Sequence, residues 1–452
     1  MVLHPKVLVL TVAFLFPSMN AVAGQDLLPD TSIDGPVLQF DFPEILVGIA
    51  EYNEGPTGTT VFYFPEPVKA AIDVRGGAPG VVNSETIRLP HDRGFTNAIC
   101  FSGGSSYGLS AATGVANALK EIWIEAGQWK RIADVTGAIV FDLGERRLNS
   151  ITPDDNLGRA ALQTARPGEF PLGAQGAGRF VMQGWPLGNP QHSGQGGAFR
   201  QVGDLKIAVF TVVNAAGVVV DRDGSIVRCG PDGANDCGQM HEVMGDMIKH
   251  GSPIDKSSLD SGTTANTTLT LVVTNAKMPY RELDRLARQV HTSMARAIQP
   301  FSTMGDGDVL VAVTTDQVAV NGIRSSWLGT LASEVAWDAV LASVPELPEM
   351  RTAEAIEWTS EQIDSVVGEY SFSPSANLRI ERDNDGIVAI GPDSENLYFP
   401  VGRPVKLTPV GDDELEVESP RRYRVGVERN GEDVVGLVLE PGPWAQRARR
   451  VN

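Results

Sequence analysis

The sequence changes character halfway along one stretch, Asp260-Ser-Gly-Thr-Thr-Ala-Asn-Thr-Thr-Leu-Thr-Leu-Val-Val-Thr-Asn-Ala-Lys277. Residues 257–265 are small and polar, a composition that predicts an exposed loop. From Thr267 the residues become β-branched and apolar, which predicts a buried strand over residues 267–273. The hydroxyl group of Thr267 therefore lies where a loop enters a sheet.

This position suits a nucleophile that the chain generates itself. If the peptide bond before Thr267 is cut, the residue gains a free α-amino group beside its own hydroxyl. An α-amine titrates near ~7.7–8.0, so part of it is an unprotonated base at neutral pH. Threonine paired with its own terminal amine is a recognised activated nucleophile. The alternative is a threonine-rich strand after a loop, with no catalytic role.

Length and charge restrict the class of protein. The chain has 452 residues, which predicts two or three domains, and it is 42% hydrophobic and 21% charged, as globular proteins are. It carries 37 Lys and Arg against 56 Asp and Glu, a net charge of −19. Nucleic acids and anionic membranes bind basic surfaces, so neither is expected as a partner.

The first 23 residues have the pattern of a removable export signal. A short basic region with His4 and Lys6 precedes an apolar run at 7–16, and Ala21-Val22-Ala23 fits the small-x-small cleavage rule. The apolar run is too short to span a bilayer as a finished helix. We therefore expect a mature protein that starts near Gly24 and is periplasmic or extracellular. The alternative is an uncleaved anchor.

The cysteines are few. Cys229 and Cys237 enclose a turn-rich loop that a disulfide could close in an oxidising compartment. Cys100 lies between Ile99 and Phe101, which predicts a buried, inert thiol.

Strand and helix patterns both occur along residues 35–343. Strands are predicted at 45–49, 59–64, 97–101, 138–143, 205–213 and 309–313, and helices at 109–123, 281–298 and 326–343. Glycine-rich turns at 74–80 and 102–108 indicate a close backbone approach or a positive φ. The second turn could bind an anion at a helix N-terminus, but it has no P-loop lysine; close packing of helix on sheet is the alternative. The helices come in pairs between strand groups, which predicts an α/β fold with sheets sandwiched by helices.

The composition of the sequence and its predicted secondary structure change near residue 345. Residues 344–348 contain two prolines and begin a linker, and from Gly368 short strand patterns alternate with frequent turns. We predict a small, separate all-β domain over residues 355–452.

The sequence has no pattern typical of histidine-dependent or metal-dependent hydrolysis. It contains six histidines, and no Gly-x-Ser-x-Gly, His-Glu-x-x-His or close Cys/His pair stands out. No metal and no cofactor are therefore expected. If the protein is a hydrolase, this favours a mechanism that needs no histidine base, and the terminal-threonine mechanism is one.

Several motifs together resemble the self-processing aminopeptidases of the L-aminopeptidase/D-esterase, or β-aminopeptidase, type. The resemblance spans about residues 35–342. It rests on Asn266-Thr-Thr-Leu-Thr-Leu-Val-Val-Thr-Asn-Ala276, Arg285-Leu-Ala-Arg288, Ala295-Arg-Ala-Ile298, Ser302-Thr-Met-Gly-Asp-Gly-Asp308, Val74-Arg-Gly-Gly-Ala-Pro-Gly80, Ser102-Gly-Gly-Ser-Ser-Tyr-Gly-Leu109, Gly176-Ala-Gly178 and Val212-Val-Asn214.

The resemblance implies an αββα layered fold for residues 24–348, with autocleavage between Asn266 and Thr267. The α chain would then cover about residues 24–266, and the β chain would start at Thr267 as the N-terminal nucleophile, with Thr268 as the alternative. Asn214 matches a position whose side-chain amide helps to hold the oxyanion. Asp306 and Asp308 match a polar pair beside the nucleophile, although 306 is a serine in one version of the pattern. The alternative is that the two aspartates only form a turn that leads into the strand at 309–313 and have no catalytic role.

The implied activity is the hydrolysis of N-terminal residues from small peptides, amides or esters, and we also expect a homo-oligomer. Some relatives place a Glu and a Tyr just before the position of Asp142 to hold the substrate amine, and residues 137–141 contain neither. One alternative is an acyltransferase of the ornithine-acetyltransferase type, which a secretory signal argues against. The other is a non-catalytic secreted binding protein with the same fold.

Overall fold

The computed structural model describes most of the chain after residue 26. The described residues are 27–89, 94–187, 190–229, 238–250, 266–320, 325–346, 354–383, 386–419, 423–440 and 442–451. The predicted export signal, the predicted loop at 257–265 and Cys237 lie outside these ranges, so what the sequence predicts for them stays a prediction. Within these ranges, no helix combines the length and the apolar character that crossing a bilayer requires.

One long strand connects two layers of sheet. The first half of strand β3 (Thr57–Val74) pairs with β2 (Leu46–Tyr52). Residues 59–69 of β3 pair with β5 (Phe95–Ser102), and residues 69–74 of β3 pair with β16 (Val309–Val318). Its ladder with β5 is irregular between Tyr63 and Val68, the stretch that contains Pro65 and Pro67. Proline has no N–H to donate, so the ladder is interrupted there.

The strand order is β11-β12-β14-β16-β3-β5-β6-β4; β2 pairs with β3, and β7 pairs with β2. The other long strands of this sheet are β11 (Gln195–Val202), β12 (Leu205–Asn214), β14 (Thr267–Ala276) and β6 (Val135–Ile139). Strand β14 lies between β12, to which it is antiparallel, and β16, to which it is parallel. Every residue of β14 is buried, as expected for a strand covered on both faces.

The two layers face each other across an aromatic core. The ring of Phe62 on β3 lies 5.1 Å from that of Phe210 on β12 and 5.5 Å from that of Phe101 on β5. Leu269, Leu271 and Val273 of β14 point into the same core. Alternate residues of β14, such as Val272, belong to a second core on the opposite face.

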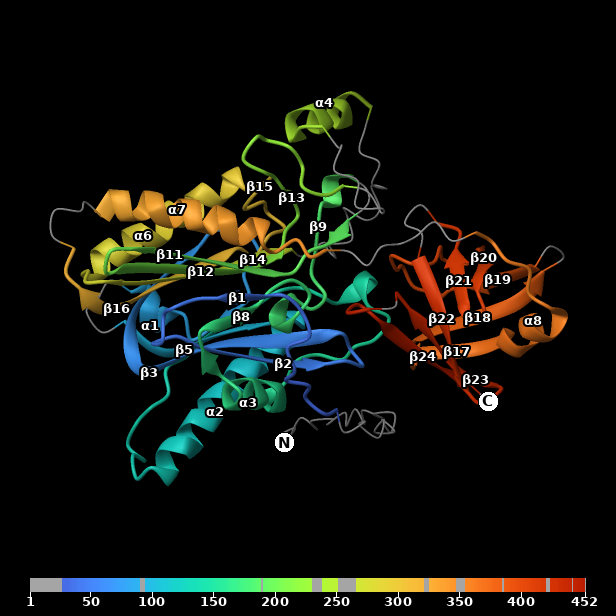
Figure 1. The fold of residues 1–452 in the computed structure, drawn as a ribbon, viewed down its shortest axis with the longest axis horizontal. Coiled ribbons are helices and arrows are strands. Elements are labelled where there is room, and N and C mark those ends of the chain that lie inside the picture. The colour runs from blue at the N-terminus through green and yellow to red at the C-terminus, as the bar shows by residue number, and fades with distance from the viewer. Residues whose placement is uncertain are drawn as a thin grey trace, which may run out of the picture.

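Helices cover the outer face of each layer (Figure 1). Helices α6 (Tyr280–Ser293) and α7 (Ser325–Leu341) pack on the layer that contains β14. Helices α2 (Ser110–Glu125) and α3 (Asp155–Gln163) pack on the layer of β2 and β5. The predicted αββα sandwich is therefore confirmed.

The shorter elements complete the sandwich and lie mainly in its connections. They are β1 (Val37–Gln39), β4 (Val81–Val82), α1 (Glu85–Arg88), η1 (Ser105–Leu109), η2 (Gly144–Arg146), β7 (Arg166–Pro167), β8 (Glu169–Pro171), η3 (Gly176–Gly178), β9 (Met182–Gln183), η4 (Trp185–Leu187), β10 (Gln191–His192), β13 (Val218–Val219), α4 (Met240–His250), η5 (Met294–Arg296) and β15 (Ile298–Gln299). One strand is displaced from its prediction: β6 covers 135–139 instead of 138–143. Asp142 consequently lies after the strand, in a loop.

The C-terminal region folds as a closed all-β barrel, which confirms the predicted small β domain. Its strands are β17 (Gly368–Ser373), β18 (Ala376–Asp383), β19 (Gly386–Ile390), β20 (Pro404–Gly411), β21 (Glu414–Val417), β22 (Tyr423–Asn430), β23 (Asp433–Leu439) and β24 (Gln446–Val451). Alternate residues such as Leu378 and Ile380 fill the interior. Helix α8 (Ser360–Val366) precedes the barrel and begins with a capping box formed by Thr359 and Gln362.

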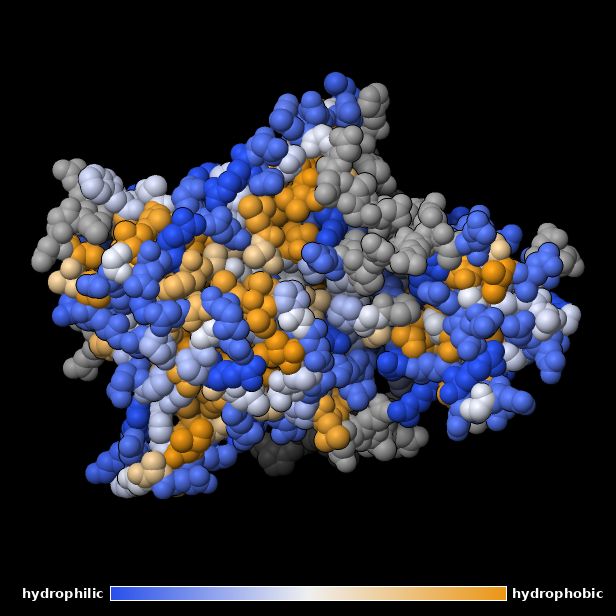
Figure 2. All heavy atoms as spheres, viewed as in Figure 1, coloured by the Kyte–Doolittle hydropathy of each residue, from blue (hydrophilic) through white to orange (hydrophobic). Residues whose placement is uncertain are grey.

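The barrel packs against the sandwich, as Figure 1 shows at the right of the molecule. Leu148 of the sandwich belongs to the barrel core, and Trp444 of the barrel packs against Ala174 and Phe180. The ring of Trp444 also stacks on His192, with 4.2 Å between the ring centres. On the face drawn in Figure 2, hydrophobic residues lie in separate groups among hydrophilic ones.

Candidate active site

The predicted site residues meet at one end of the central strands. Thr267 is the first residue of β14 and lies directly opposite Asn214, the last residue of β12. Asn266 forms a parallel bridge with Asp306, just before β16. Strand pairing therefore brings together Thr267, Asn214 and Asp306, which are far apart in the sequence.

Backbone hydrogen bonds hold both the N–H and the carbonyl of Asn266, the residue before the peptide bond to Thr267. The Asn266 N–H donates to the Gly305 carbonyl at 2.9 Å, and the Asn266 carbonyl oxygen accepts from the Gly307 N–H at 2.6 Å. Thr267 Oγ1 also donates to that carbonyl oxygen at 2.5 Å. A hydroxyl thus lies beside a carbonyl whose oxygen already faces a backbone donor, the arrangement needed to stabilise an oxyanion.

Gly307 leaves room for this arrangement. A Cβ atom on Gly307 would lie 2.6 Å from Thr267 Oγ1 and 2.6 Å from the Ala78 carbonyl oxygen. The glycine-rich turn at 74–80 covers the same segment, because the Ala78 N–H donates to the Asp306 carbonyl at 2.8 Å. A Cβ on Gly76 would collide with the backbone of Asp306 and Asp308. The close backbone approach predicted for this turn is therefore made against the candidate site.

Asp306 and Asp308 organise the backbone on both sides of Thr267. Asp306 accepts hydrogen bonds from the N–H of Ala216 at 3.0 Å, and from the N–H and Oγ1 of Thr303 at 2.8 and 2.5 Å. Asp308 accepts from the Thr268 N–H at 2.6 Å and, through its other oxygen, from the N–H and Oγ of Ser302 at 3.0 and 3.1 Å. Burial and the nearby charge of Asp306 raise the pKa of Asp308 to about 7.

The two candidate threonines differ in their surroundings. The Thr267 hydroxyl contacts the carbonyl of the bond before it, whereas Thr268 Oγ1 is buried and has no hydrogen-bond partner. Successive strand residues point to opposite faces, so Thr268 cannot occupy the position of Thr267 without a change of register.

Asn214 is fixed by three hydrogen bonds. Its Oδ1 accepts from the Met182 N–H at 3.1 Å and from Arg146 Nη1 at 2.5 Å, and its Nδ2 donates to the Phe141 carbonyl at 3.0 Å. In the uncut chain the Asn266 carbonyl receives its backbone hydrogen bond from Gly307. The oxyanion role expected for Asn214 stays a prediction.

Arg146 is a site residue that the sequence did not reveal. Its side chain is fully buried, and Nη2 donates to the side-chain oxygen of Asn266 at 2.8 Å. Its guanidinium carbon lies 4.7 Å from the centre of the Trp185 ring. Burial lowers the pKa of Arg146 to about 10, so it stays protonated at neutral pH. In the sequence, Arg146 and Arg147 form an ordinary basic pair, with nothing that separates a buried arginine from an exposed one.

Arg147 and Asp142 explain the second glycine turn. The Asp142 carboxylate accepts from Gly104 N–H at 2.7 Å, Thr57 Oγ1 at 2.6 Å and Arg147 Nη2 at 3.2 Å. The turn at 102–108 therefore binds an anion, and that anion is the chain's own carboxylate.

The barrel contacts the segment that carries Arg146. The Tyr398 hydroxyl donates to the Arg146 carbonyl at 2.9 Å, and the Leu397 N–H donates to the Glu145 carbonyl at 3.0 Å. The Leu148 N–H donates to Gln446 Oε1 at 2.6 Å.

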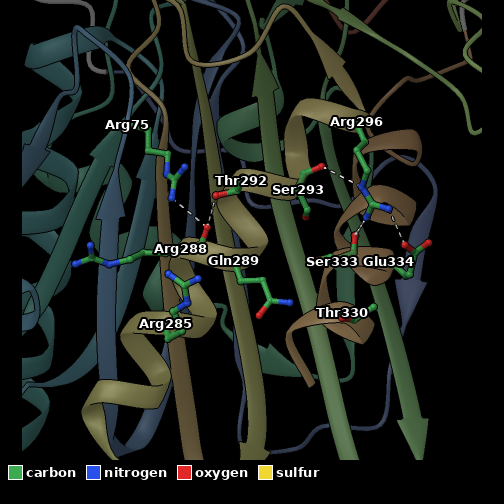
Figure 3. Close-up of a pocket in the computed structure, with 10 residues that line it drawn as sticks. All are labelled: Arg75, Arg285, Arg288, Gln289, Thr292, Ser293, Arg296, Thr330, Ser333 and Glu334. Atoms are coloured by element: carbon green, nitrogen blue, oxygen red, sulfur yellow. Dashed lines mark hydrogen bonds and ion pairs between the residues drawn. The ribbon is translucent and has the colours of Figure 1, made fainter. Parts of the chain in front are cut away.

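A separate pocket of about 620 Å³ lies over α6 and α7 and contains four arginines (Figure 3). Three of them pair with carboxylates: Arg75 with Asp73, Arg288 with Asp284, and Arg296 with Glu334. None of the residues around Thr267 lines it, so this pocket is not the reaction site.

Cys100 is buried and free, as predicted. Cys237 lies outside the described residues, so its disulfide with Cys229 stays a prediction. Over the part of the chain that the structure describes, no group of three His, Cys, Asp or Glu side chains could hold a metal ion.

Known proteins match most of this chain. The profile of peptidase family S58 matches residues 40–363. A 6-aminohexanoate-oligomer endohydrolase from Paenarthrobacter ureafaciens is 40% identical over 329 residues, which are 70% of this chain and 88% of that protein. An uncharacterised aminopeptidase of Mycobacterium tuberculosis is 30% identical over 276 residues, 58% of this chain and 74% of that protein. A β-aminopeptidase structure from Burkholderia sp. aligns with a TM-score of 0.49 and 19% identity, covering 69% of this chain and 89% of that one.

Proposed function

The chain belongs to peptidase family S58, as its motifs predicted, and is a hydrolytic peptidase; we propose that it cuts itself between Asn266 and Thr267 and then uses Thr267 as an N-terminal nucleophile. The observation that carries the proposal is the contact of Thr267 Oγ1 with the carbonyl oxygen of the bond to be cut, at 2.5 Å. Hydrolysis is preferred to the acyl-transfer and non-catalytic alternatives because the family is one of peptidases.

Self-cleavage begins with attack of Thr267 Oγ1 on the Asn266 carbonyl carbon. The developing oxyanion receives the Gly307 N–H, which already lies 2.6 Å from that oxygen. The C–N bond then breaks, the Thr267 amine takes up the proton that the hydroxyl loses, and an ester joins Asn266 to Thr267 Oγ1. Water hydrolyses the ester, which leaves a carboxylate on Asn266 and a free amine on Thr267.

The cut enzyme repeats the same chemistry on a substrate. The α-amine of Thr267 accepts the hydroxyl proton, Oγ1 attacks the substrate carbonyl, and the leaving amine or alcohol departs with that proton. Water then releases the acyl group. Asp308 holds the Thr268 N–H at 2.6 Å, and so fixes the backbone that carries the nucleophile.

Substrates are proposed to be small peptides, amides or esters, from which the enzyme removes N-terminal residues. Recognition of a substrate amine calls for an acidic group, yet Asp142, Asp306 and Asp308 each accept hydrogen bonds from the protein itself. Arg146 places a positive charge beside Asn266.

These observations favour a second candidate, cleavage inside linear amide oligomers. The relative that is 40% identical is named for such an activity, on 6-aminohexanoate oligomers. Mass spectrometry of the products of an unmodified hexapeptide, and of a linear 6-aminohexanoate oligomer, distinguishes the two. Stepwise loss of single N-terminal residues indicates an aminopeptidase, and internal fragments indicate an endohydrolase.

The nucleophile is tested by three variants made in the full chain. Thr267→Ala should remain a single chain and have no activity, whereas Thr267→Ser keeps a hydroxyl and should still be cut. Thr268→Ala should be cut at 266/267. Normal processing of Thr267→Ala would eliminate the proposed mechanism.

Export and assembly complete the proposal. The export signal predicted for residues 1–23 supports a periplasmic or extracellular enzyme, and we propose a homo-oligomer. Fractionation of cells that express the full chain tests the first statement, and light scattering of the purified protein tests the second.

A further inference from the structure

We propose that Arg146 is the specificity-determining residue on the acyl side of the site, and that the C-terminal barrel holds it in place. This inference rests on the proposed self-cleavage. Arg146 would bind the Asn266 side chain in the first reaction, and an amide or carboxylate oxygen of the acyl donor in the cut enzyme.

The argument starts from the geometry of self-cleavage. Asn266 supplies the acyl group of the first reaction, so its side chain marks where the corresponding part of any later acyl donor lies. That side chain's oxygen accepts from Arg146 Nη2 at 2.8 Å, and both groups are buried. When residue 266 leaves the site, the same Nη2 group faces the incoming acyl donor.

The direction of the guanidinium is fixed by its other contacts. Nη1 donates to Asn214 Oδ1 at 2.5 Å and to the Phe141 carbonyl at 2.7 Å. The rings of Trp185 and Phe141 lie 4.7 and 5.4 Å from the guanidinium carbon. Arg146 therefore presents a planar donor edge to the acyl side, which suits an amide or carboxylate oxygen and disfavours an ammonium group.

The barrel holds the backbone segment that carries Arg146. Tyr398 donates its hydroxyl proton to the Arg146 carbonyl at 2.9 Å and accepts a hydrogen bond from Gln446 Nε2 at 2.8 Å. Gln446 Oε1 accepts from the Leu148 N–H at 2.6 Å. Both barrel residues are buried, and they hold the backbone at Arg146 and at Leu148, so they act as positioning residues. This gives the barrel a role in the active site.

A double-mutant cycle tests the contact between Arg146 and Asn266. The first-order rate of self-cleavage is measured for the full chain, Arg146→Met, Asn266→Ala and the double variant. A hydrogen bond from a charged donor should make each single change slow cleavage by roughly tenfold or more. The double variant should be slowed by far less than the product of the two factors. A double variant slowed by the full product, or an unaffected Arg146→Met, overturns the inference.

Arg147→Met is the matched control. Arg147 is equally buried and adjacent, but it binds Asp142 at 3.2 Å instead of Asn266. Its effect on the rate should multiply with that of Asn266→Ala, because the two side chains share no contact. Failure of the proposed function is separable, because it shows before any rates are compared: the unmodified chain would stay uncut, or Thr267→Ala would be cut.

The substrate arm uses enzyme in which slow self-cleavage has gone to completion. The kcat/KM values for asparaginyl-4-nitroanilide and alanyl-4-nitroanilide are compared, because only the first has an acceptor where Asn266 has one. The asparaginyl preference of the unmodified enzyme should fall about tenfold in Arg146→Met. An equal preference in both enzymes contradicts the proposed subsite.

Discussion

One added methyl group at Gly307 should slow self-cleavage strongly and still leave the protein folded. In Gly307→Ala the new Cβ would lie 2.6 Å from Thr267 Oγ1, closer than real Cβ atoms approach a neighbour, so the nucleophile or the turn must retreat by several tenths of an ångström. The same residue donates its N–H to the Asn266 carbonyl at 2.6 Å. Alanine keeps this N–H, but the retreat moves it away from the carbonyl oxygen. Without a correctly placed oxyanion donor, acyl transfer slows by about 10²–10³-fold, and overpacking costs about 1–3 kcal/mol of stability. We therefore expect self-cleavage about 100-fold to 1,000-fold slower in a folded protein.

The assay follows the conversion of one chain into two on denaturing gels, with calorimetry to compare Tm values. Gly48→Ala is the control, since Gly48 lies on β2 and its Cβ would meet the Ala161 carbonyl of helix α3, away from Thr267. It should lose at least as much stability, because its Cβ would lie only 1.9 Å from that carbonyl oxygen, and still be cut at the unmodified rate. Cleavage of Gly307→Ala within about threefold of that rate would refute the oxyanion argument, because a displaced donor predicts a slowing of at least ~100-fold.

Two further predictions concern the carboxylate pair and the barrel. Asp306→Asn removes a charge that, with burial, raises the pKa of Asp308 to about 7, so the pKa of Asp308 should be lower in this variant. Because the pKa of Asp308 is raised in the folded state, its contribution to the free energy of unfolding decreases as the pH rises from the ordinary carboxyl range to about 7. Between pH 5 and pH 8, the free energy of unfolding measured by denaturation should therefore decrease less in Asp306→Asn than in the unmodified protein. An identical pH dependence in the two proteins would contradict the coupling. Tyr398→Phe removes the donor to the Arg146 carbonyl and should slow self-cleavage several-fold, whereas Tyr370→Phe removes a similar buried hydrogen bond, to Val366, and should not. Equal rates for the two tyrosine variants would show that the barrel does not position Arg146.

Much of the sandwich could be predicted from the sequence because its local patterns agree with its final packing. The stripe of Leu283, Leu286, Ala287 and Val290 gave α6, and these residues are buried against β14 and β16. The change from polar to β-branched residues at Thr267 marked the start of β14. Both signals depend on the near neighbours of each residue, which the sequence displays directly.

Other features depend on contacts that no local pattern encodes. The crossing of β3 between the layers depends on which strands pair with each half of it, although Pro65 and Pro67 mark where the ladder fails. In the sequence, Arg146 is one of two adjacent arginines, a pattern typical of an exposed surface. Only the folded chain shows that it is buried beside Asn214 and Asn266.

The roles of the two aspartates illustrate the same limit within the site. The motif around Asp306 and Asp308 located them beside Thr267, but not what they bind. Each carboxylate accepts three hydrogen bonds, mostly from backbone N–H groups of separate segments. The turn at 302–308 and the strand pairing determine these hydrogen-bond partners, so they could not be predicted from the sequence.

The central claim is that the chain breaks before Thr267, and intact-mass measurement of the purified full-length product tests it most directly. We predict two polypeptides whose masses place the junction between residues 266 and 267, with threonine as the first residue of the smaller one. A single polypeptide that remains continuous across this junction after prolonged incubation would contradict the account.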